Sequence, residues 1–299
     1  MDAVARLTSI VVVAADSGPP LQTCVDSALA SKAAVEVVLV DNASADGEVD
    51  AAASRHAADA RLRVVRNGAN LGFGPACNRG AQLAKGDVLL FLNPDCELPA
   101  GAVGALRSCL DADARLGLLG ATVCDADGRP ARGSRRRDPS LRRALATLTG
   151  LSRWESRWPA LAGVEMPPAA EPGAPVEYVE AVSGACMMIR RQLFDRLAGF
   201  DEGYFLHVED LDLCRRVRDA GFRVGVASAV RVRHASGSSS RHRPLFVARH
   251  KHRGMWRYFR KFDPAARNGL VRLCVRLGLW THFAAAAPLQ AIRTRRRRR

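Results

Sequence analysis

Apolar and polar positions alternate with two different periods in the first hundred residues. Short apolar runs, many of them β-branched, predict buried strands, and they lie at Leu7–Ala14, Val35–Val40, Leu62–Arg66 and Asp87–Leu92. Amphipathic helical spacing separates them, with one helix starting at Pro20 and another expected to end at Gly86. This β-α-β-α order predicts an α/β fold of Rossmann-like type, a mostly parallel central sheet flanked by helices.

The pattern dissolves between residues 127 and 177, which we interpret as an irregular insertion with one helix, Leu141–Leu151. Long segments of this kind often form lids or binding segments. Order returns as a strand and a helix at 179–200, a strong helix near 206–222 and short strands at 223–234. We expect one domain over residues 1–240 and a basic, amphipathic C-terminal extension of helices over 241–299.

Apolar residues in the extension are interrupted by Arg272 and Arg276, so the sequence does not predict a spanning helix, which needs about 20 apolar residues. Two placements remain open, at a membrane interface or packed on the domain.

The chain has 299 residues, 48% of them hydrophobic, and a formal net charge of +15. Such a charge indicates a polyanionic partner, namely nucleic acid, an anionic membrane or a phosphorylated substrate. The excess lies in three basic segments and not in residues 1–128, which argues against a dedicated nucleic-acid binder. With no C-x-x-C pair and no N-terminal signal, we expect a cytoplasmic protein, either free or bound peripherally to the inner face of the plasma membrane.

Polar residues follow the predicted strands, where ligands of such sheets bind. Asp41 can accept hydrogen bonds from a nucleotide or cap a turn. Gly72 precedes a helix and would let a phosphate approach its N-terminus. Asp95 could hold a divalent cation together with substrate phosphates, or be a solvated turn acid. His234 is either a metal or phosphate ligand or a structural residue.

The segment VEDLDLCRRVRDAG carries the strongest signal. On a helix, Asp210 shares the apolar face of Leu213, Cys214 and Val217, which predicts an inward carboxylate suited to a general base, or a helix cap. The helix dipole should keep it ionised. Asp212 is expected to point outward and pair with Arg215 or Arg216.

In order along the chain, these motifs resemble the inverting glycosyltransferases of family 2, which have the GT-A fold. The likeness runs from about Thr8 to His234 and rests on VVLVDNASADG, NLGFGPACNRG, LLFLNPDCELP and SGACMMIRRQLFDRLAGFDEGYFLHVEDLDLCRRVRDAGFRV. Within the family the chain is most similar to rhamnosyltransferase-like enzymes of bacterial cell-surface polysaccharide assembly.

The resemblance implies that Asp210 is the catalytic base and that Asp95 and His234 bind Mg²⁺ or Mn²⁺ with the donor diphosphate. It places Ser-Gly-Ala-Cys, from Ser183, beside the acceptor. The implied nucleotide and donor contacts are Asp16, Asp41, Asn42, Asn70, Gly72, Asn78 and Asn93.

Three departures from the family pattern qualify this likeness. Asn93 replaces the first acid of the D-x-D motif, and Ala14–Asp16 replaces the usual Asn-Tyr-Asn. No Q-x-x-R-W follows the E-D motif, which implies a non-processive enzyme.

The implied activity is metal-dependent inverting transfer from a nucleoside-diphosphate sugar, with dTDP-rhamnose favoured, to a glycan or lipid-linked acceptor. The extension would contact an anionic membrane, and no nucleic-acid partner is expected. Two alternatives remain. A nucleotidyltransferase needs a basic loop after the first strand, whereas AADSGPP lacks Lys and Arg. A non-catalytic polyanion-binding protein explains the charge but not the strand-end acids.

Overall fold

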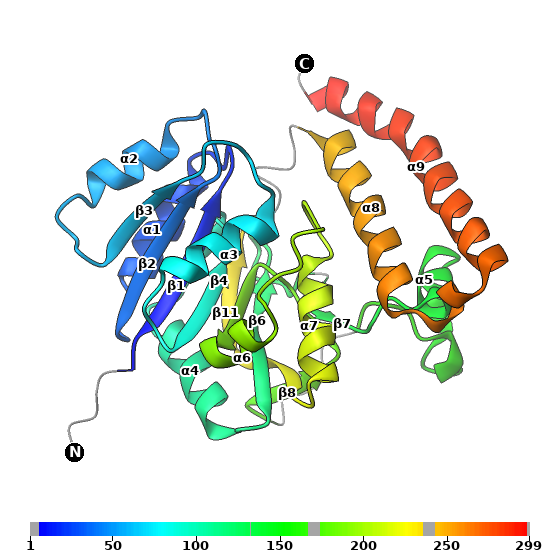
Figure 1. Ribbon diagram of the computed structural model, residues 1–299, viewed down its shortest axis with the longest axis horizontal. Helices are drawn as coiled ribbons and strands as arrows, with labels where there is room; N and C mark the ends of the chain where they lie inside the picture. Colours follow the sequence, from blue (N-terminus) through cyan, green and yellow to red (C-terminus); the bar gives the residue numbers. More distant parts are fainter. Residues whose placement is uncertain (1–5, 132, 167–173, 236–242, 298–299) are drawn as a thin grey trace.

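A nine-stranded sheet forms the centre of the protein (Figure 1). The computed structural model describes residues 6–131, 133–166, 174–235 and 243–297, without the side chains of 286–297. Eight strands follow the order β3-β2-β1-β4-β10-β6-β11-β5, and β8 pairs with β11. Their bounds are β1 Thr8–Ala14, β2 Val35–Asp41, β3 Leu62–Arg66, β4 Val88–Leu92, β5 Cys96–Glu97, β6 Leu116–Cys124, β8 Val176–Val179, β10 Cys186–Arg190 and β11 Arg223–His234.

The N-terminal half of the sheet is parallel, as predicted. Strands β3, β2, β1 and β4 pair in parallel, and β10 enters antiparallel between β4 and β6. The short strands expected at 223–234 are one twelve-residue strand, β11. That prediction was wrong because a register shift between Ala227 and Arg231 interrupts the alternation along a continuous strand.

Helices cover both faces of the sheet, with a separate apolar core on each. One face carries α1, α2 and α4, and the other carries α3, α6 and α7. Their bounds are α1 Pro20–Leu29, α2 Glu48–Arg55, α3 Phe73–Leu83, α4 Ala102–Ala112, α6 Arg191–Arg196 and α7 Glu209–Asp219. Helix α3 stops before Gly86, where an end was expected. Gly86 instead lies so close to β1 that a Cβ would be 2.5 Å from the Leu7 carbonyl oxygen.

The insertion is more ordered than the sequence predicts. It contains α5 Leu141–Leu148, which ends before the expected Leu151, and two 3₁₀ helices, η1 Leu151–Trp154 and η2 Pro159–Leu161. Its strand β7, Arg135–Arg136, pairs with β9, Ala181–Val182, beside the start of β10. This separate two-stranded pairing ties the insertion to the segment that leads into Ser183 and β10.

The C-terminal extension is a helical hairpin. It consists of α8 Pro244–Phe262, η3 Pro264–Arg267 and α9 Gly269–Arg297. Helix α8 buries Tyr258 and Phe259, and α9 packs along α8 on the side away from the sheet (Figure 1). Within the described residues, every helix is too short or too polar to cross a bilayer. The predicted boundary at 240 lies outside the described residues.

Candidate active site

A cavity of about 600 Å³ opens beyond the carboxyl ends of β1, β2 and β4. Eight of the ten residues that the sequence nominated line it, brought together from loops that are far apart in the chain. These are Asp16, Asn42, Asn70, Gly72, Asn93, Asp95, Asp210 and His234. The rule that parallel sheets bind ligands at this edge therefore located the cavity.

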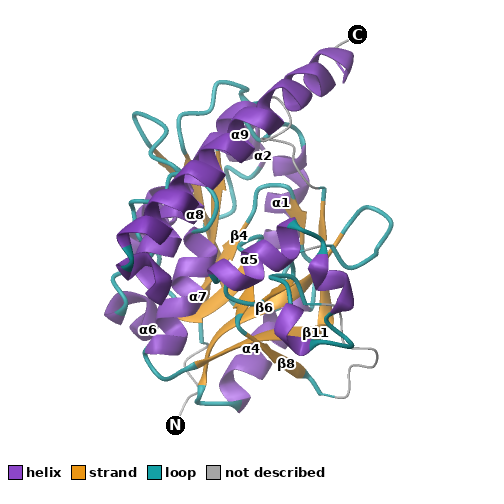
Figure 2. Cartoon of the chain, turned by 90° about the vertical axis from the view of Figure 1, so that its right-hand side faces the viewer, coloured by secondary structure: helices purple, strands orange, loops and turns teal. Residues whose placement is uncertain are grey.

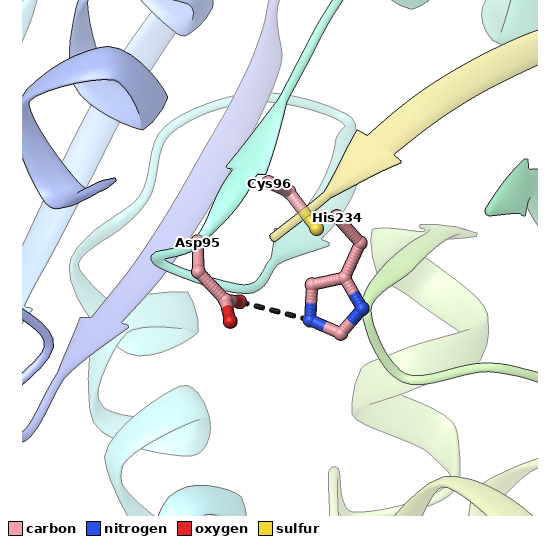
Figure 3. A group of neighbouring side chains, drawn as sticks. All are labelled: Asp95, Cys96 and His234. Carbon is pink, nitrogen blue, oxygen red and sulfur yellow. Dashed lines mark ion pairs between the residues drawn. The ribbon is translucent and has the colours of Figure 1, made fainter. Parts of the chain in front are cut away.

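Asp95 and His234 are neighbours because of strand pairing. Strand β5 runs antiparallel to β11 and sets Cys96 opposite His234. The Nε2 atom of His234 lies 2.9 Å from Oδ1 of Asp95, and both side chains are largely buried (Figure 3). Pro94 stops β4 at this point, because it has no N–H to donate to the sheet.

This pair fits a hard divalent cation. Two octahedral ligands at right angles, each about 2.1 Å from an ion, lie about 3 Å apart, which matches the Asp95–His234 separation. Cys96 lies within 4.8 Å of both, but thiolate is a soft ligand that Mg²⁺ and Mn²⁺ do not prefer. Burial raises the pKa of the Cys96 thiol well above its usual value, and its Sγ donates to the Ala185 carbonyl. The donor set is therefore one carboxylate and one imidazole.

A strained junction presents the start of α7 to the cavity. His207 and Val208 have φ values of 66° and 77°, a left-handed conformation that costs a non-glycine residue about 1–3 kcal/mol. Gly254 of α8 packs against this junction, where a Cβ would lie 3.0 Å from the His207 carbonyl oxygen. The strain is maintained by packing, and it directs Glu209 and Asp210 into the cavity.

Asp210 is surrounded by hydrogen-bond donors. Its Oδ2 accepts from Nη2 of Arg136 and from the Gly184 N–H at 3.0 Å, and Oδ1 accepts from the Leu211 N–H at 2.8 Å. Burial alone would raise the pKa of Asp210, but the Arg136 guanidinium and these hydrogen bonds hold it below its usual value. The carboxylate is therefore ionised at neutral pH, as a general base must be.

Glu209, in contrast to the ionised Asp210, is mainly protonated and uncharged at neutral pH. It is buried, lines the same cavity, and its Oε2 has no hydrogen-bond partner. Burial, followed by repulsion from Asp210, raises the pKa of Glu209 to about 8. Two adjacent carboxyl groups thus differ in protonation at neutral pH.

The loops that carry the predicted contacts to the donor nucleotide are linked by asparagine amides. Asn42 donates to Oδ1 of Asn70 at 2.9 Å, and its own Oδ1 accepts from the Leu71 N–H and from Asn67. Asp16 accepts from the Ala45 N–H at 2.8 Å. These contacts fix the rim of the cavity before any ligand is bound.

Asp41 and Asn78 do not line the cavity. Asp41 pairs with Arg66 at 2.9 Å and accepts from the Ser44 N–H, the turn-capping role that the sequence left open. Asn78 is buried in α3, where its amide exchanges hydrogen bonds with the backbone of Phe200. Their predicted donor contacts remain predictions.

The outward orientation predicted for the Asp212 side chain was wrong. Its side chain is fully buried rather than outward, and it binds Tyr204, Arg216 and Lys261, with Nζ of Lys261 at 2.7 Å. Lys261 belongs to α8 and Tyr204 to the loop before α7, and the two cover this side of the helix. Arg216 is a partner as expected, whereas Arg215 pairs with Asp138 and Asp219.

Sequence reasoning allowed the insertion to be a binding segment but named no site residue in it or in α8. Arg136 lies in one of the three basic segments, which the sequence linked only to a polyanionic partner. Val247, Lys251 and Met255 line the cavity at four-residue spacing, a signal visible in the sequence but not connected to the site. Arg243 and Phe246 also line it.

Comparison with known proteins gives the family. The model of the family "Glycosyl transferase family 2" matches residues 9–197. The N-acetylglucosaminyl-diphospho-decaprenol L-rhamnosyltransferase of Mycobacterium tuberculosis is 32% identical over 272 residues, covering 83% of this chain and 86% of that protein.

Solved structures confirm the fold. The mannosyltransferase PcManGT from Pyrobaculum calidifontis, in complex with GDP-Man and Mn²⁺, matches with a TM-score of 0.58 and 19% identity, covering 96% of this chain and 73% of that chain. GalNAc-T7 with UDP, GalNAc and Mn²⁺ matches with a TM-score of 0.60 and 19% identity, over 78% of this chain and 44% of that one. The predicted GT-A architecture is thus confirmed, and the chain belongs to glycosyl transferase family 2 as a glycosyltransferase enzyme.

Proposed function

We propose that this enzyme transfers a sugar, with inversion, from a nucleoside-diphosphate sugar to a hydroxyl group of a glycan or lipid-linked acceptor. One observation carries the proposal: an ionised, cavity-facing Asp210 and the Asp95–His234 pair line the same cavity at the ligand edge of the sheet. The first provides a base, and the second provides a site for the charge of a diphosphate.

Asp95 and His234 would hold Mg²⁺ or Mn²⁺, as their separation fits adjacent ligands of such an ion. When bound, the ion would neutralise charge on the donor diphosphate. The Mn²⁺ in the two solved structures described above, which share the fold, supports a divalent cation here without choosing between the two metals.

The chain's own groups account for the rest of the reaction. Asp210 takes the proton of the acceptor hydroxyl as that oxygen attacks the anomeric carbon. The bond from the anomeric carbon to the diphosphate breaks on the opposite side, so the configuration inverts. Ser183 and Gly184 line the cavity beside Asp210, which supports an acceptor-binding role for this segment.

The rhamnosyltransferase relative favours L-rhamnose as the transferred sugar and a lipid diphosphate as the carrier of the acceptor. The sequence resemblance favours dTDP-rhamnose as the donor. Such an acceptor implies work at the inner face of a membrane in cell-surface polysaccharide assembly. We extend the proposal to the C-terminal extension as an anionic-membrane contact. Residues 241–299 contain 17 Lys and Arg and a single acid, Asp263, which supports that contact.

Donor identity can be tested by calorimetry with dTDP-rhamnose, UDP-sugars and GDP-sugars, each with Mg²⁺ or Mn²⁺. The proposal predicts that one nucleotide class binds, that Asp95→Ala weakens this metal-dependent binding at least about tenfold, and that Asp210→Asn binds donor normally but transfers no sugar. Substantial transfer by Asp210→Asn would remove Asp210 from the role of base.

A further inference from the structure

The insertion carries an exposed apolar surface of its own. Among the described residues, twelve large apolar side chains are exposed, and five of them lie in α5, η1 and the turn after η1. Three more lie on α9 at the spacing of one helix face. The eight are Leu145, Leu148, Leu151, Trp154, Trp158, Leu270, Leu273 and Leu277.

Both segments lie on the same side of the molecule. In Figure 1 α5 and α9 stand at the right, beyond α7, and Figure 2 looks directly onto that side. The N–H of Leu141, the first residue of α5, donates to Asp263 at the end of α8, with a distance of 2.7 Å. The insertion and the C-terminal hairpin therefore meet at a defined contact.

Ion pairs and hydrogen bonds hold the insertion that carries these exposed side chains. Arg143 pairs with Glu180 at 2.6 Å, and Arg137 binds Glu155 at 3.1 Å and the Gly163 carbonyl at 3.2 Å. The rings of Trp154 and Trp158 pack 6.0 Å apart, and both remain about half exposed. Ordered tryptophans that face solvent are costly in water, which points to a partner that covers them.

The charges around this surface have one sign. Residues 141–162 contain four arginines and one acid, Glu155, whose charge is offset by Arg137. Arg142, Arg153 and Arg157 are exposed, and the Arg157 guanidinium lies 5.4 Å from the centre of the Trp158 ring. Tryptophan and leucine flanked by arginine are the composition of interfacial membrane segments.

We propose that α5, η1 and η2 form a second membrane-docking surface, which binds an anionic lipid bilayer together with the outer face of α9. The inference rests on the proposed function, because a lipid-linked acceptor has to be met at the bilayer. Trp154 and Trp158 would lie at the level of the headgroups, and the arginines would contact lipid phosphates.

The test is flotation of the full chain with vesicles of phosphatidylcholine, with and without phosphatidylglycerol. Binding should require the anionic lipid and weaken with salt. The double variant Trp154→Ser/Trp158→Ser should reduce the partition coefficient about tenfold or more. Leu145→Ser/Leu148→Ser, on the neighbouring helix turns, should also reduce it.

Tyr178→Ser is the matched control. Tyr178 is as exposed as the two tryptophans, at 49% against 48% and 50%, but lies on β8 at the lower edge of Figure 1. The Tyr178→Ser variant should bind vesicles like the wild type. Equal loss in this control, or unchanged binding in both insertion variants, would overturn the proposal. So would a wild-type dimer in solution that the tryptophan variant dissociates, because the surface would then be a protein interface.

Donor binding separates this proposal from the proposed function. The insertion variants should bind the nucleotide sugar with wild-type affinity. Vesicle binding by a protein that binds no nucleotide sugar would refute the proposed function and leave the docking surface standing.

Discussion

The charge of Asp210 depends on donors from three separate parts of the chain. Arg136 comes from β7, Gly184 from the turn before β10, and Leu211 from α7 itself. A side chain at Gly184 would place a Cβ 3.1 Å from the Cβ of Asp210, so the turn needs glycine to approach the carboxylate. The helix dipole was the expected source of ionisation, whereas the contacts in the structure identify Arg136 and the two backbone N–H groups.

Replacing Arg136 by Gln should move the acidic limb of the pH profile of kcat/KM to higher pH. Without the guanidinium, burial raises the pKa of Asp210, so the base is protonated over a wider range. The ratio of wild-type to variant activity should be larger near about pH 5.5 than near about pH 8.

Arg136→Lys keeps a positive charge and should shift the limb less. An equal loss of activity at every pH would show instead that Arg136 acts only by holding the fold or a substrate.

Glu209 should make stability depend on pH in the opposite sense from an ordinary paired acid. The unfolded chain releases this proton near pH 4.5, whereas the folded protein retains it up to about 8. Because the folded state then binds more protons, its stability falls as pH rises through this window. Glu209→Gln removes that loss.

The gain in Tm from Glu209→Gln should therefore be larger at pH 8 than at pH 5, by about 2 °C or more. Thermal unfolding at the two pH values measures it, with Glu97→Gln as the control, because the Glu97 side chain is partly exposed and pairs with Arg233. A gain independent of pH would contradict the assigned protonation.

At the scale of elements, the start of α3 is joined to the loop before α7. Gly72 has a φ of 91°, and a Cβ there would lie 2.5 Å from the Phe205 carbonyl oxygen. The N–H of Phe73 donates to that same oxygen at 2.8 Å. Gly72 thus sets the distance between the start of α3 and the loop that leads into α7, the helix that carries Asp210.

Gly72→Ala should lower the free energy of unfolding by about 2 kcal/mol or more, since it combines a strained φ with a backbone clash. Urea unfolding measures the loss. Gly68, in the same loop, has open space around its Cβ position, so Gly68→Ala should change stability by less than about 0.5 kcal/mol. Similar losses in both variants would mean that the whole loop, not the contact with Phe205, is sensitive.

Helices and strands, which form between residues close in sequence, could be predicted. Contacts between residues far apart in the sequence could not. The buried run of β4 ending in Asn93-Pro94-Asp95 located the cavity edge, because parallel strands end together. The Asp212 side chain was predicted to be exposed because the helical pattern of α7 has a single apolar face. In the structure Lys261 of α8 also covers the side of α7 that carries Asp212. Arg136 could not be assigned, since nothing local distinguishes it from its arginine neighbours.

At the scale of the whole molecule, the cavity proposed for sugar transfer and the outer helix are separate. The cavity is lined by Arg243 just before α8 and by Phe246, Val247, Lys251 and Met255 of α8, and by none of the side chains described for α9. Helix α9 packs on α8 and η3 instead, where His252 and His282 lie 3.0 Å apart. Most of the chain's positive charge beyond Phe262 belongs to α9 and the residues after it.

Deleting residues 268–299 should therefore separate membrane binding from donor binding. The truncated protein loses Leu270, Leu273 and Leu277 together with eight arginines, so its partition onto anionic vesicles should fall about tenfold or more. Its affinity for the nucleotide sugar should change less than about threefold, because the cavity lining is intact. Flotation and calorimetry on the same preparation measure both quantities. A truncated protein that binds vesicles fully but loses the nucleotide sugar would show that α9 supports the cavity through α8 and is not a membrane contact.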